Sequence, residues 1–385
     1  MKKSIVIAPE QIKKNNRNRI YEYIYRQGEK GISQREILVA LGLSRPTLIY
    51  NLRELKKKGL IIESGLLETV QFGRKPVIWK ANADYKIALG VEIMRSVVKI
   101  IAIDLYASKI EREVIEIEFK NEEKYFEYIS EKIKKFISSL KLKDVHKKIL
   151  GIGFAIQGLV SADGTQVIYG EILKCTGLTI DVFTKWLDYP CKFVHEPDGA
   201  ALSELWVSPE LAQAVYLSIS IHLGGAMIAK RQIMNGIHRH SATFEHIEAQ
   251  PGGKLCYCGK RGCFETICSM EALVGSDKEP DEFFKRVREN DPEALERWKI
   301  FLKYLAKLIA HLHLMIDLKF ILGGHLAPYF NEDDIKVLYE EIKTYTPFEE
   351  DEDYILISKM PSHNITVGAA LSYIIKFLEE LGIEN

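Results

Sequence analysis

The chain has 385 residues, which is too many for one compact domain and predicts two or three. It carries 53 Lys and Arg against 53 Asp and Glu, with 47% hydrophobic and 28% charged residues, a composition that excludes disordered and fibrous proteins. There is no apolar run of the roughly 18 residues that a membrane span needs, no signal-peptide pattern at the start, and no cysteine-rich disulfide framework. We therefore expect a cytoplasmic protein that contacts no membrane.

The balanced total charge hides a basic amino-terminal segment. Residues 1–80 contain 17 Lys and Arg and 7 Asp and Glu, a net charge of +10, so the remaining residues carry −10. A small basic module on a larger acidic body predicts contact with a polyanion. A basic surface without any partner is the alternative.

The pattern of the basic segment predicts three helices. Residues 15–27 have apolar residues at helical spacing. A capping-box pattern at Ser33 opens a short second helix, Gly42 ends it, and Ser44 can cap a third helix that runs to Lys58. A helix, a glycine-containing turn and a second helix form the helix-turn-helix pattern of DNA-binding proteins.

The third helix has an apolar face and a polar face. Leu48, Leu52 and Leu55 share one side and should pack inward. The opposite side and the amino-terminal end carry groups that can reach base edges and phosphates in a major groove. The predicted DNA contacts on this helix are Arg45, Thr47, Tyr50, Arg53 and Lys57. A solvated basic helix end, favoured by the helix dipole alone, is the alternative.

Two short strands after the third helix predict a wing. They lie at residues 59–63 and 77–80. In the segment between them, residues 71–76, a glycine and a proline surround Arg74 and Lys75. Such a segment predicts a basic arm suited to a narrow minor groove, and it is equally compatible with an interdomain linker.

From residue 88 onward, strands and helices alternate. Apolar, β-branched runs at residues 89–93 and 97–105 predict a hairpin. Helical spacing over residues 121–140 predicts an amphipathic helix, and residues 149–156 predict a further strand. No internal repeat of fixed short period is present. The body of the chain is therefore predicted to be α/β.

The strongest chemical signal is a group of metal-ligating residues. His246, Cys256, Cys258 and Cys263 lie within 18 residues, among glycines that let the backbone wrap tightly. This ligand set suits tetrahedral Zn²⁺. Four protein ligands leave no open coordination position, so we expect the zinc to be structural. Reduced cysteines without a metal are the alternative.

Together these features resemble the ROK family of bacterial repressors and sugar kinases. The resemblance covers essentially the whole chain, and the stretch from His246 to Cys263, followed by Phe264 and Glu265, is similar to the family signature. The helix-turn-helix and the linker at residues 73–76 resemble the repressor branch, of the xylose-repressor type. The resemblance implies an α/β protein with an amino-terminal winged helix-turn-helix, followed by a two-lobed actin-like (ribonuclease-H-like) sugar-kinase-type fold.

The resemblance also implies where a kinase would bind ATP, and the sequence departs from the kinase pattern there. The first phosphate loop, Asp-Ile-Gly-Gly-Thr in the kinases, is Glu92–Ser96 here, and its Met and Arg side chains should obstruct ATP. The second, Gly-Thr-Gly, is Ser220–His222 here, and Glu196 takes the position of the catalytic aspartate. We therefore expect no catalytic residues; an ATP-dependent sugar kinase of the glucokinase or N-acetylglucosamine kinase class is the alternative.

The resemblance implies a sugar site that is only partly kept. The sugar motif Gly-Glu-Ile-Gly-His of the family is Ala242–His246 here, so a threonine replaces a sugar-binding glutamate, with Glu245 nearby. The sugar contacts that the resemblance implies are Glu196, Asp198, Thr243, His246 and Glu265.

These features predict a carbohydrate-responsive DNA-binding transcriptional regulator, a repressor of sugar-utilisation genes that sugar binding releases. Its partners would be a double-stranded DNA operator and a small carbohydrate effector. The resemblance implies a homodimer or a dimer of dimers, in which cleft closure would change the spacing of two recognition helices. A regulator whose body has lost ligand binding and serves only for dimerisation is a further alternative.

The expected domain boundaries follow from this reading. Residues 1–70 would form the winged helix-turn-helix and residues 71–84 the basic arm. The first lobe would comprise residues 85–195 together with 365–385, and the second lobe, with the zinc loop, residues 196–364. In the family the last helix packs back on the first lobe, and the carboxy-terminal residues have the apolar face of such a helix.

Overall fold

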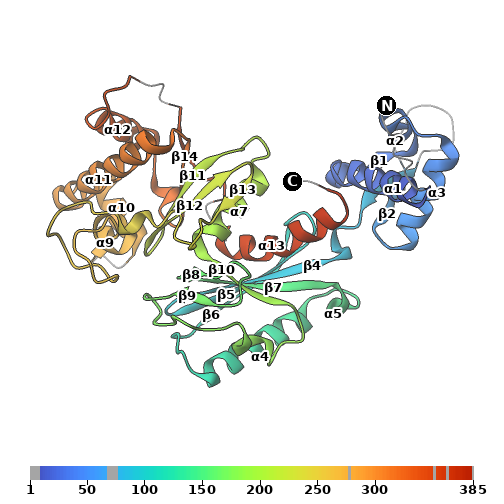
Figure 1. Ribbon diagram of the computed structural model, residues 1–385, viewed down its shortest axis with the longest axis horizontal. Helices are drawn as coiled ribbons and strands as arrows, with labels where there is room; N and C mark the ends of the chain where they lie inside the picture. The colour runs from blue at the N-terminus through green and yellow to red at the C-terminus, as the bar shows by residue number, and fades with distance from the viewer. Residues whose placement is uncertain (1–8, 67–76, 276–278, 350–352, 361–363, 384–385) are drawn as a thin grey trace, which may run out of the picture.

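The chain folds into a small amino-terminal module and a two-lobed body (Figure 1). The computed structural model describes residues 9–66, 77–275, 279–349, 353–360 and 364–383. Within these ranges, no helix is both long enough and apolar enough to cross a membrane.

The amino-terminal module has three helices and a three-stranded antiparallel sheet in the order β1-β3-β2. Its elements are α1 (Pro9–Tyr25), β1 (Ile32–Ser33), α2 (Gln34–Leu41), α3 (Arg45–Lys57), β2 (Ile61–Leu66) and β3 (Val77–Ala81). The three predicted helices and the two wing strands are confirmed. Helix α1 begins earlier than residue 15, and the two-residue strand β1 was not predicted. The predicted basic arm, with Arg74 and Lys75, lies outside the described residues.

Side-chain caps set the starts of α2 and α3. The Ser33 hydroxyl accepts a hydrogen bond from the backbone N–H of Glu36, and the Glu36 carboxylate accepts one from the Ser33 N–H at 2.9 Å. Ser44 caps α3 in the same way through the N–H of Thr47. The three leucines predicted to face inward from α3 are each 1% exposed, so the opposite face of this helix points to solvent.

The first lobe contains a five-stranded sheet in the order β10-β7-β4-β5-β6. Strands β10, β7 and β4 are parallel, and β4, β5 and β6 are antiparallel. The strands of this lobe are β4 (Ile87–Ile93), β5 (Val97–Ile103), β6 (Lys109–Glu116), β7 (Ile149–Ile156), β8 (Leu159–Val160), β9 (Val167–Tyr169) and β10 (Cys191–His195). Helix α4 (Glu123–Ser139) packs on one face of the sheet, near the short helices α5 (Val145–Lys148) and α6 (Asp181–Thr184). The predicted hairpin, helix and strand are confirmed.

The second lobe repeats the same strand order, β13-β12-β11-β14-β15, with the same mixture of antiparallel and parallel pairs. Its strands are β11 (Ala214–Ile219), β12 (Leu223–Ala229), β13 (Gln232–Met234), β14 (Phe320–Gly323) and β15 (Ile355–Ile357). Its helices are α8 (Glu265–Cys268), α9 (Met270–Val274), α10 (Pro280–Arg288), α11 (Pro292–Ile316) and α12 (Glu332–Ile342). The two lobes therefore share one strand topology, and the two-lobed α/β body that the resemblance implies is confirmed.

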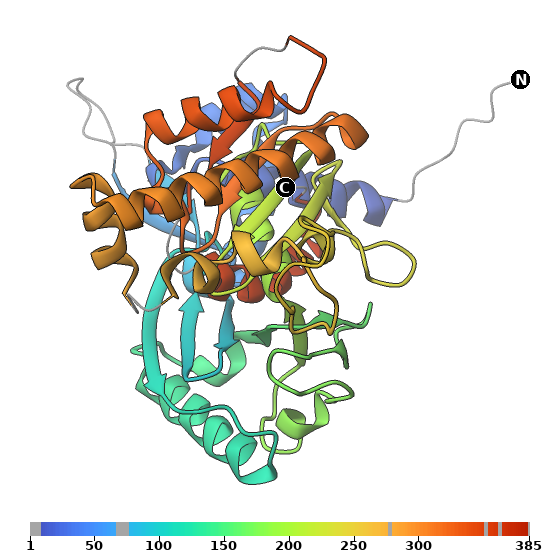
Figure 2. The same cartoon turned by 90° about the vertical axis from the view of Figure 1, so that its left-hand side faces the viewer.

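Helices α7 (Glu196–Val207) and α13 (Asn364–Glu380) lie where the two lobes meet, and Figures 1 and 2 show α13 between the two large sheets. The two helices cross at a pair of glycines: a Cβ on Gly368 would lie 1.7 Å from the carbonyl oxygen of Gly199. Helix α13 meets the first sheet equally closely, since a Cβ on Gly90 would lie 1.8 Å from the Thr366 oxygen. The expected return of the last helix to the first lobe is confirmed.

The winged module is fastened to the body by an aromatic contact at the end of α1. The Tyr25 and Tyr106 rings stack with centroids 4.6 Å apart. The Tyr25 hydroxyl donates to the Leu105 carbonyl at 2.6 Å, and the Tyr106 hydroxyl donates to the Tyr25 carbonyl at 3.0 Å. From the last turn of α7, the Trp206 indole donates to the Tyr106 carbonyl at 3.2 Å. Winged module, first lobe and α13 share one buried apolar cluster, which ties their orientations together.

Candidate functional site

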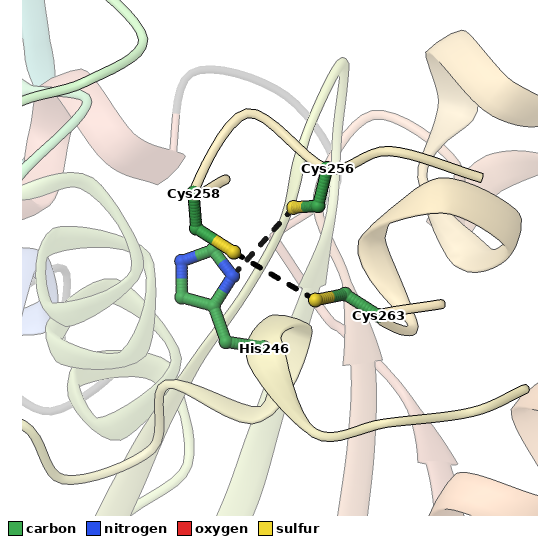
Figure 3. Close-up of side chains that lie close together, drawn as sticks. All are labelled: His246, Cys256, Cys258 and Cys263. Carbon is green, nitrogen blue, oxygen red and sulfur yellow. Dashed lines mark hydrogen bonds between the residues drawn. The ribbon is translucent and has the colours of Figure 1, made fainter. Parts of the chain in front are cut away.

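Four metal-ligating side chains meet in the second lobe (Figure 3). The ligating atoms of His246, Cys256, Cys258 and Cys263 all lie within 4.8 Å of one another. The histidine comes from the short helix η3 (Phe244–His246), and the cysteines come from the loop that follows it. Gly259 and Gly262 let this loop turn back on itself, with φ of 83° and 77°, a region that other residues rarely adopt.

The spacing within this cluster fits a tetrahedral ion. The Sγ atoms of Cys258 and Cys263 are 3.7 Å apart, and the Cys256 Sγ lies 3.8 Å from the His246 Nδ1. A tetrahedron with metal–sulfur bonds of about 2.3 Å has edges of about 3.8 Å. The predicted cluster is confirmed as a group of side chains that could hold a metal ion.

A cavity of about 420 Å³ opens between the lobes beside the cluster. Residues between β7 and the end of β10 form the first-lobe wall, and the start of α7, the β11–β12 turn and the metal-ligand loop form the other wall. Tyr257, which lies between two of the cysteines, lines the cavity with its ring 5.1 Å from the His246 ring. The volume is within the range of small-molecule sites. The metal cluster therefore holds one wall of this cavity.

Glu196 is the first residue of α7 and a buried part of the cavity wall, 7% exposed. Burial raises the pKa of its carboxyl to about 7; the nearby Glu92 carboxylate raises it further, and His195 and His222 oppose the rise. Glu92 lies on β4 and pairs with Lys99 at 3.3 Å. Glu196 is thus held in a site that disfavours its charge.

We expect the variant Glu196→Gln to be more stable than the native chain at pH 8 and to lose this advantage at pH 5. The pKa of Glu196 in the folded state lies above its ordinary value of 4.5. The protonated carboxyl therefore makes its full contribution to the stability of the folded state below about pH 4.5, and this contribution is lost as the pH rises through about 7. This gap corresponds to about 3 kcal/mol of unfolding free energy, which urea denaturation at both pH values measures. Glu296→Gln, at an exposed carboxyl on α11, is the control; the same response in both variants would contradict the assignment.

Two histidines line the cavity, and each has a carboxylate behind it. His195 ends β10 in the first lobe, and its Nδ1 lies 3.6 Å from Asp198. His222 lies in the β11–β12 turn of the second lobe, and its Nδ1 lies 2.7 Å from Glu265. Burial lowers the pKa of His195, but the hydrogen bond and charge of Asp198, with further carboxylates, outweigh burial and raise it overall.

The structure separates the predicted sugar contacts into two groups. Glu196, Thr243 and His246 line the cavity. Asp198 and Glu265 are not on its wall and lie behind the two histidine rings. These five residues stay predictions as sugar contacts.

The sequence reasoning missed several polar groups of the cavity wall. The residues His195, His222 and Tyr257 line the cavity together with Glu245. Among the described residues, the buried Oε2 of Glu245 has no hydrogen-bond partner. Burial also raises the pKa of Glu245 to about 7. His222 replaces a glycine of the kinase pattern, and this departure was the available signal for its role.

The positions of the two kinase phosphate loops are occupied by tight turns. Between β4 and β5 the Met94 N–H donates to the Val97 carbonyl, and Met94 is 9% exposed. The Arg95 guanidinium reaches the Ile172 carbonyl at 3.5 Å. At the second position, the His222 ring stands beside Glu265. Side chains thus stand where glycine backbone would approach a phosphate.

The outer face of α3 is a compact basic surface. Arg45, Tyr50, Arg53 and Lys57 are exposed, and Thr47 is half-buried because its hydroxyl contacts the capping Ser44. No ion pair is found for the two arginines or for Lys57 within the described residues. In contrast, the neighbouring Lys56 pairs with Glu63 on β2 at 2.8 Å, which links α3 to the wing.

Comparison with known families matches two parts of the chain. The model described as "ROK family" matches residues 88–374, and the model described as "Winged helix-turn-helix DNA-binding" matches residues 14–62. The chain is 25% identical to a xylose repressor of Caldicellulosiruptor bescii over 249 residues, which is 64% of this chain and 62% of that protein. It is 31% identical to an N-acetylmannosamine kinase of Haemophilus influenzae over 152 residues, which is 37% of this chain and 51% of that protein. The chain thus spans less than two thirds of these two relatives.

Solved structures share the fold. A ROK family transcriptional regulator described as a homolog of the E. coli MLC protein matches with a TM-score of 0.68 at 20% identity, over 95% of this chain and 99% of that one. A ROK family glucokinase from Streptomyces griseus, in complex with glucose and AMPPNP, matches with a TM-score of 0.64 at 18% identity, over 74% of this chain and 98% of that one. The regulator match extends over the winged module as well as the body, and the kinase match covers the smaller share.

Proposed function

The chain belongs to the ROK family, and from this premise we propose that it is a carbohydrate-responsive DNA-binding transcriptional regulator. The proposal is carried by one combination: a winged module with an exposed basic surface on α3 is packed onto a body with a polar cavity of sugar size. In this proposal the protein represses sugar-utilisation genes in the cytoplasm, and sugar binding releases it from its operator. Since three of the similar proteins are xylose repressors, d-xylose is the first sugar to test.

We propose that the sugar occupies the cavity between the lobes. Glu196, Thr243, Glu245 and His246 offer carboxylate, hydroxyl and imidazole groups to it. Several rigid hydrogen-bonding groups in one concave site are what the recognition of adjacent sugar hydroxyls requires. Because the first lobe lines the opposite wall with residues such as Gln157 and His195, a bound sugar would favour the closed cleft.

We propose that α7 and the aromatic contact at Tyr25 transmit closure of the cleft to the winged module that binds DNA. Helix α7 starts at the cavity with Glu196, and Trp206 in its last turn donates a hydrogen bond to the Tyr106 carbonyl beside α1. In a homodimer, or a dimer of dimers, a change in lobe angle would change the distance between two recognition helices and their fit to successive major grooves.

We propose that the metal of the Cys/His cluster is structural zinc, because its four ligands leave no open position and their spacing fits. When bound, the ion would fix the loop. His246 would then present its other ring nitrogen toward the cavity, and Tyr257 would be held against the His222 ring, 5.6 Å away. The zinc would thus support the sugar site without contacting the sugar.

Removing the metal should therefore weaken sugar binding by about tenfold or more, because a ligand loop loses its shape with its ion. Titration calorimetry of d-xylose, d-glucose and N-acetyl-d-mannosamine into zinc-loaded, chelated and zinc-restored protein measures this and tests the proposed sugar response. Cys258→Ser should behave like the chelated protein, and Cys191→Ser, outside the cluster, like the loaded one. Unchanged affinity in verified metal-free protein would contradict the supporting role.

A sugar kinase is the second candidate, favoured by the relatives that are N-acetylmannosamine kinases. The occupied phosphate-loop positions and Glu196 in place of aspartate weigh against it. A shift of about 1 Å in a catalytic group costs about 100-fold in rate, so Glu196 alone would not abolish transfer. A coupled assay that shows sugar-dependent ADP release at ordinary enzyme rates, lost in Glu196→Gln, would establish the kinase instead.

We propose the domain limits expected from the sequence. The winged module would occupy residues 1–70, the arm 71–84, the first lobe 85–195 with 365–385, and the second lobe 196–364. In support of this division, the first large sheet ends with β10 at residue 195, and α13 packs on that sheet.

A further inference from the structure

The cavity is lined by the imidazole rings of two histidines, and not by the carboxylates of Asp198 and Glu265 that were predicted to contact the sugar. His222 and His195 come from different lobes and line the same cavity, while Glu265 and Asp198 stand behind them. We infer that the two histidines touch the sugar and that Glu265 and Asp198 are positioning residues that act through these rings. This inference rests on the proposed sugar-binding function.

Both oxygens of Glu265 already have a protein partner. Its Oε1 lies 2.7 Å from the His222 Nδ1, and its Oε2 accepts the Leu223 N–H at 2.8 Å. The residue is 5% exposed. The Glu265 carboxylate is not on the cavity wall, whereas the His222 ring is, so a ligand in the cavity meets the ring first.

The carboxylates also decide which atom of each ring is offered. Glu265 can accept a hydrogen bond from the His222 Nδ1 at 2.7 Å, and the Asp198 carboxylate, 3.6 Å from the His195 Nδ1, attracts a proton to that nitrogen. The proton of a neutral ring then stays on Nδ1, and the Nε2 lone pair remains available. Within the described residues, neither Nε2 has a protein partner. In its neutral form, each ring is then an acceptor for the ligand, His195 from the first lobe and His222 from the second.

The remaining polar groups on the wall set the class of ligand. Glu196 and Glu245 add carboxyl groups beside the rings. Glu171, also on the wall, is paired with Lys174 at 2.7 Å, so this lysine is already engaged. A cavity with these acceptors suits an uncharged polyhydroxyl sugar, whose hydroxyls donate, and it disfavours a phosphorylated sugar, whose anion would meet carboxylates. The structure assigns an unphosphorylated monosaccharide to this site.

A double-mutant cycle separates a positioning role from direct contact. In zinc-loaded protein at pH 8, His222→Ala should weaken monosaccharide binding by about tenfold or more, and Glu265→Gln should weaken it by about tenfold in the native chain. In the His222→Ala background, Glu265→Gln should have no further effect. Equal losses in both backgrounds would show that Glu265 contacts the sugar and would overturn the inference. Tight binding of d-glucose 6-phosphate would overturn the assigned class.

Glu271→Gln is the matched control, because this exposed carboxylate lies 4.0 Å from the same Nδ1 without lining the cavity. It should change affinity less than about twofold, as expected for an exposed, screened charge. If Glu271→Gln weakened binding as much as Glu265→Gln does, any nearby negative charge would serve, and Glu265 would have no specific role in positioning the His222 ring.

A readout without ligand keeps the inference testable if no sugar of the panel binds. Nitrogen NMR of ¹⁵N-histidine-labelled protein at pH 8 should show His195 and His222 protonated at Nδ1 and bare at Nε2. Asp198→Asn and Glu265→Gln should each move the proton of their own ring only. Protonation at Nε2 in the native chain would overturn the inference. In contrast, failure of the whole sugar panel would remove the proposed sugar response, and the NMR result would still decide the positioning roles.

Discussion

The double variant Arg45→Ala/Arg53→Ala should lose specific DNA binding by about 30-fold or more while its fold and metal content stay unchanged. Both arginines are exposed on the outer face of α3, and no ion pair is found for them within the described residues. An arginine that reads a guanine in the major groove contributes about 1–3 kcal/mol of discrimination, so two of them exceed a tenfold effect together. Fluorescence anisotropy on a duplex from upstream of its own gene measures the loss.

The control for this variant removes the same charge elsewhere. Lys299→Ala/Lys303→Ala changes two exposed cations on α11, far along the chain from the winged module. It should leave specific binding within about twofold at fixed salt, because exposed charges beyond a Debye length are screened. An equal loss in the control would mean that net charge, and not the face of α3, binds the DNA.

The variant Gly368→Ala should destabilise the body severely, by at least about 3 kcal/mol. The added methyl would lie 1.7 Å from the Gly199 carbonyl oxygen and 2.3 Å from its carbon, and both are backbone atoms that no rotamer change can move. Helices α7 and α13 would have to separate where the lobes meet. A fall in the urea midpoint, followed by circular dichroism, measures the effect.

Ser372→Ala is the control on the same helix. Ser372 lies one turn further along α13 and is half-buried, and its hydroxyl donates to the Ala369 carbonyl within the helix. Its loss should cost less than about 1 kcal/mol. If Gly368→Ala were as stable as Ser372→Ala, α7 and α13 could separate with little loss in the free energy of unfolding. The close crossing would then contribute little to stability.

Local signals in the sequence predicted the winged module well. Ser33 and Ser44 each cap a helix through an amide three residues away, so the whole interaction lies within one turn. The leucines of α3 follow from helical periodicity in the same way, and so does the exposed face opposite them. The metal cluster was also predictable, because its ligands lie close together in the chain and only a few ligand types suit such a site.

The cavity could be predicted only in part, because its groups come from distant parts of the chain. His222 and Glu265 are 43 residues apart in the sequence. No pattern of residue spacing indicates that the His222 ring lies between Glu265 and the cavity. His195 and Asp198 are close in sequence, but only the direction of α7 relative to the cleft shows that the aspartate points away from the wall. The two lobes share an order of strand pairing, and different residues can form the same order. The shared topology therefore needs no internal repeat of fixed short period in the sequence.

The central claim is that a sugar controls DNA binding by this chain, and one titration tests it most directly. Zinc-loaded protein is bound to the labelled upstream duplex at fixed salt, with unrelated duplex as competitor, and monosaccharides are added last while anisotropy is recorded. We expect specific binding that one unphosphorylated monosaccharide releases. The Glu196→Gln variant should bind the duplex normally but need far more sugar for release. Binding that no sugar changes, or no preference for the upstream duplex over the competitor, would contradict it.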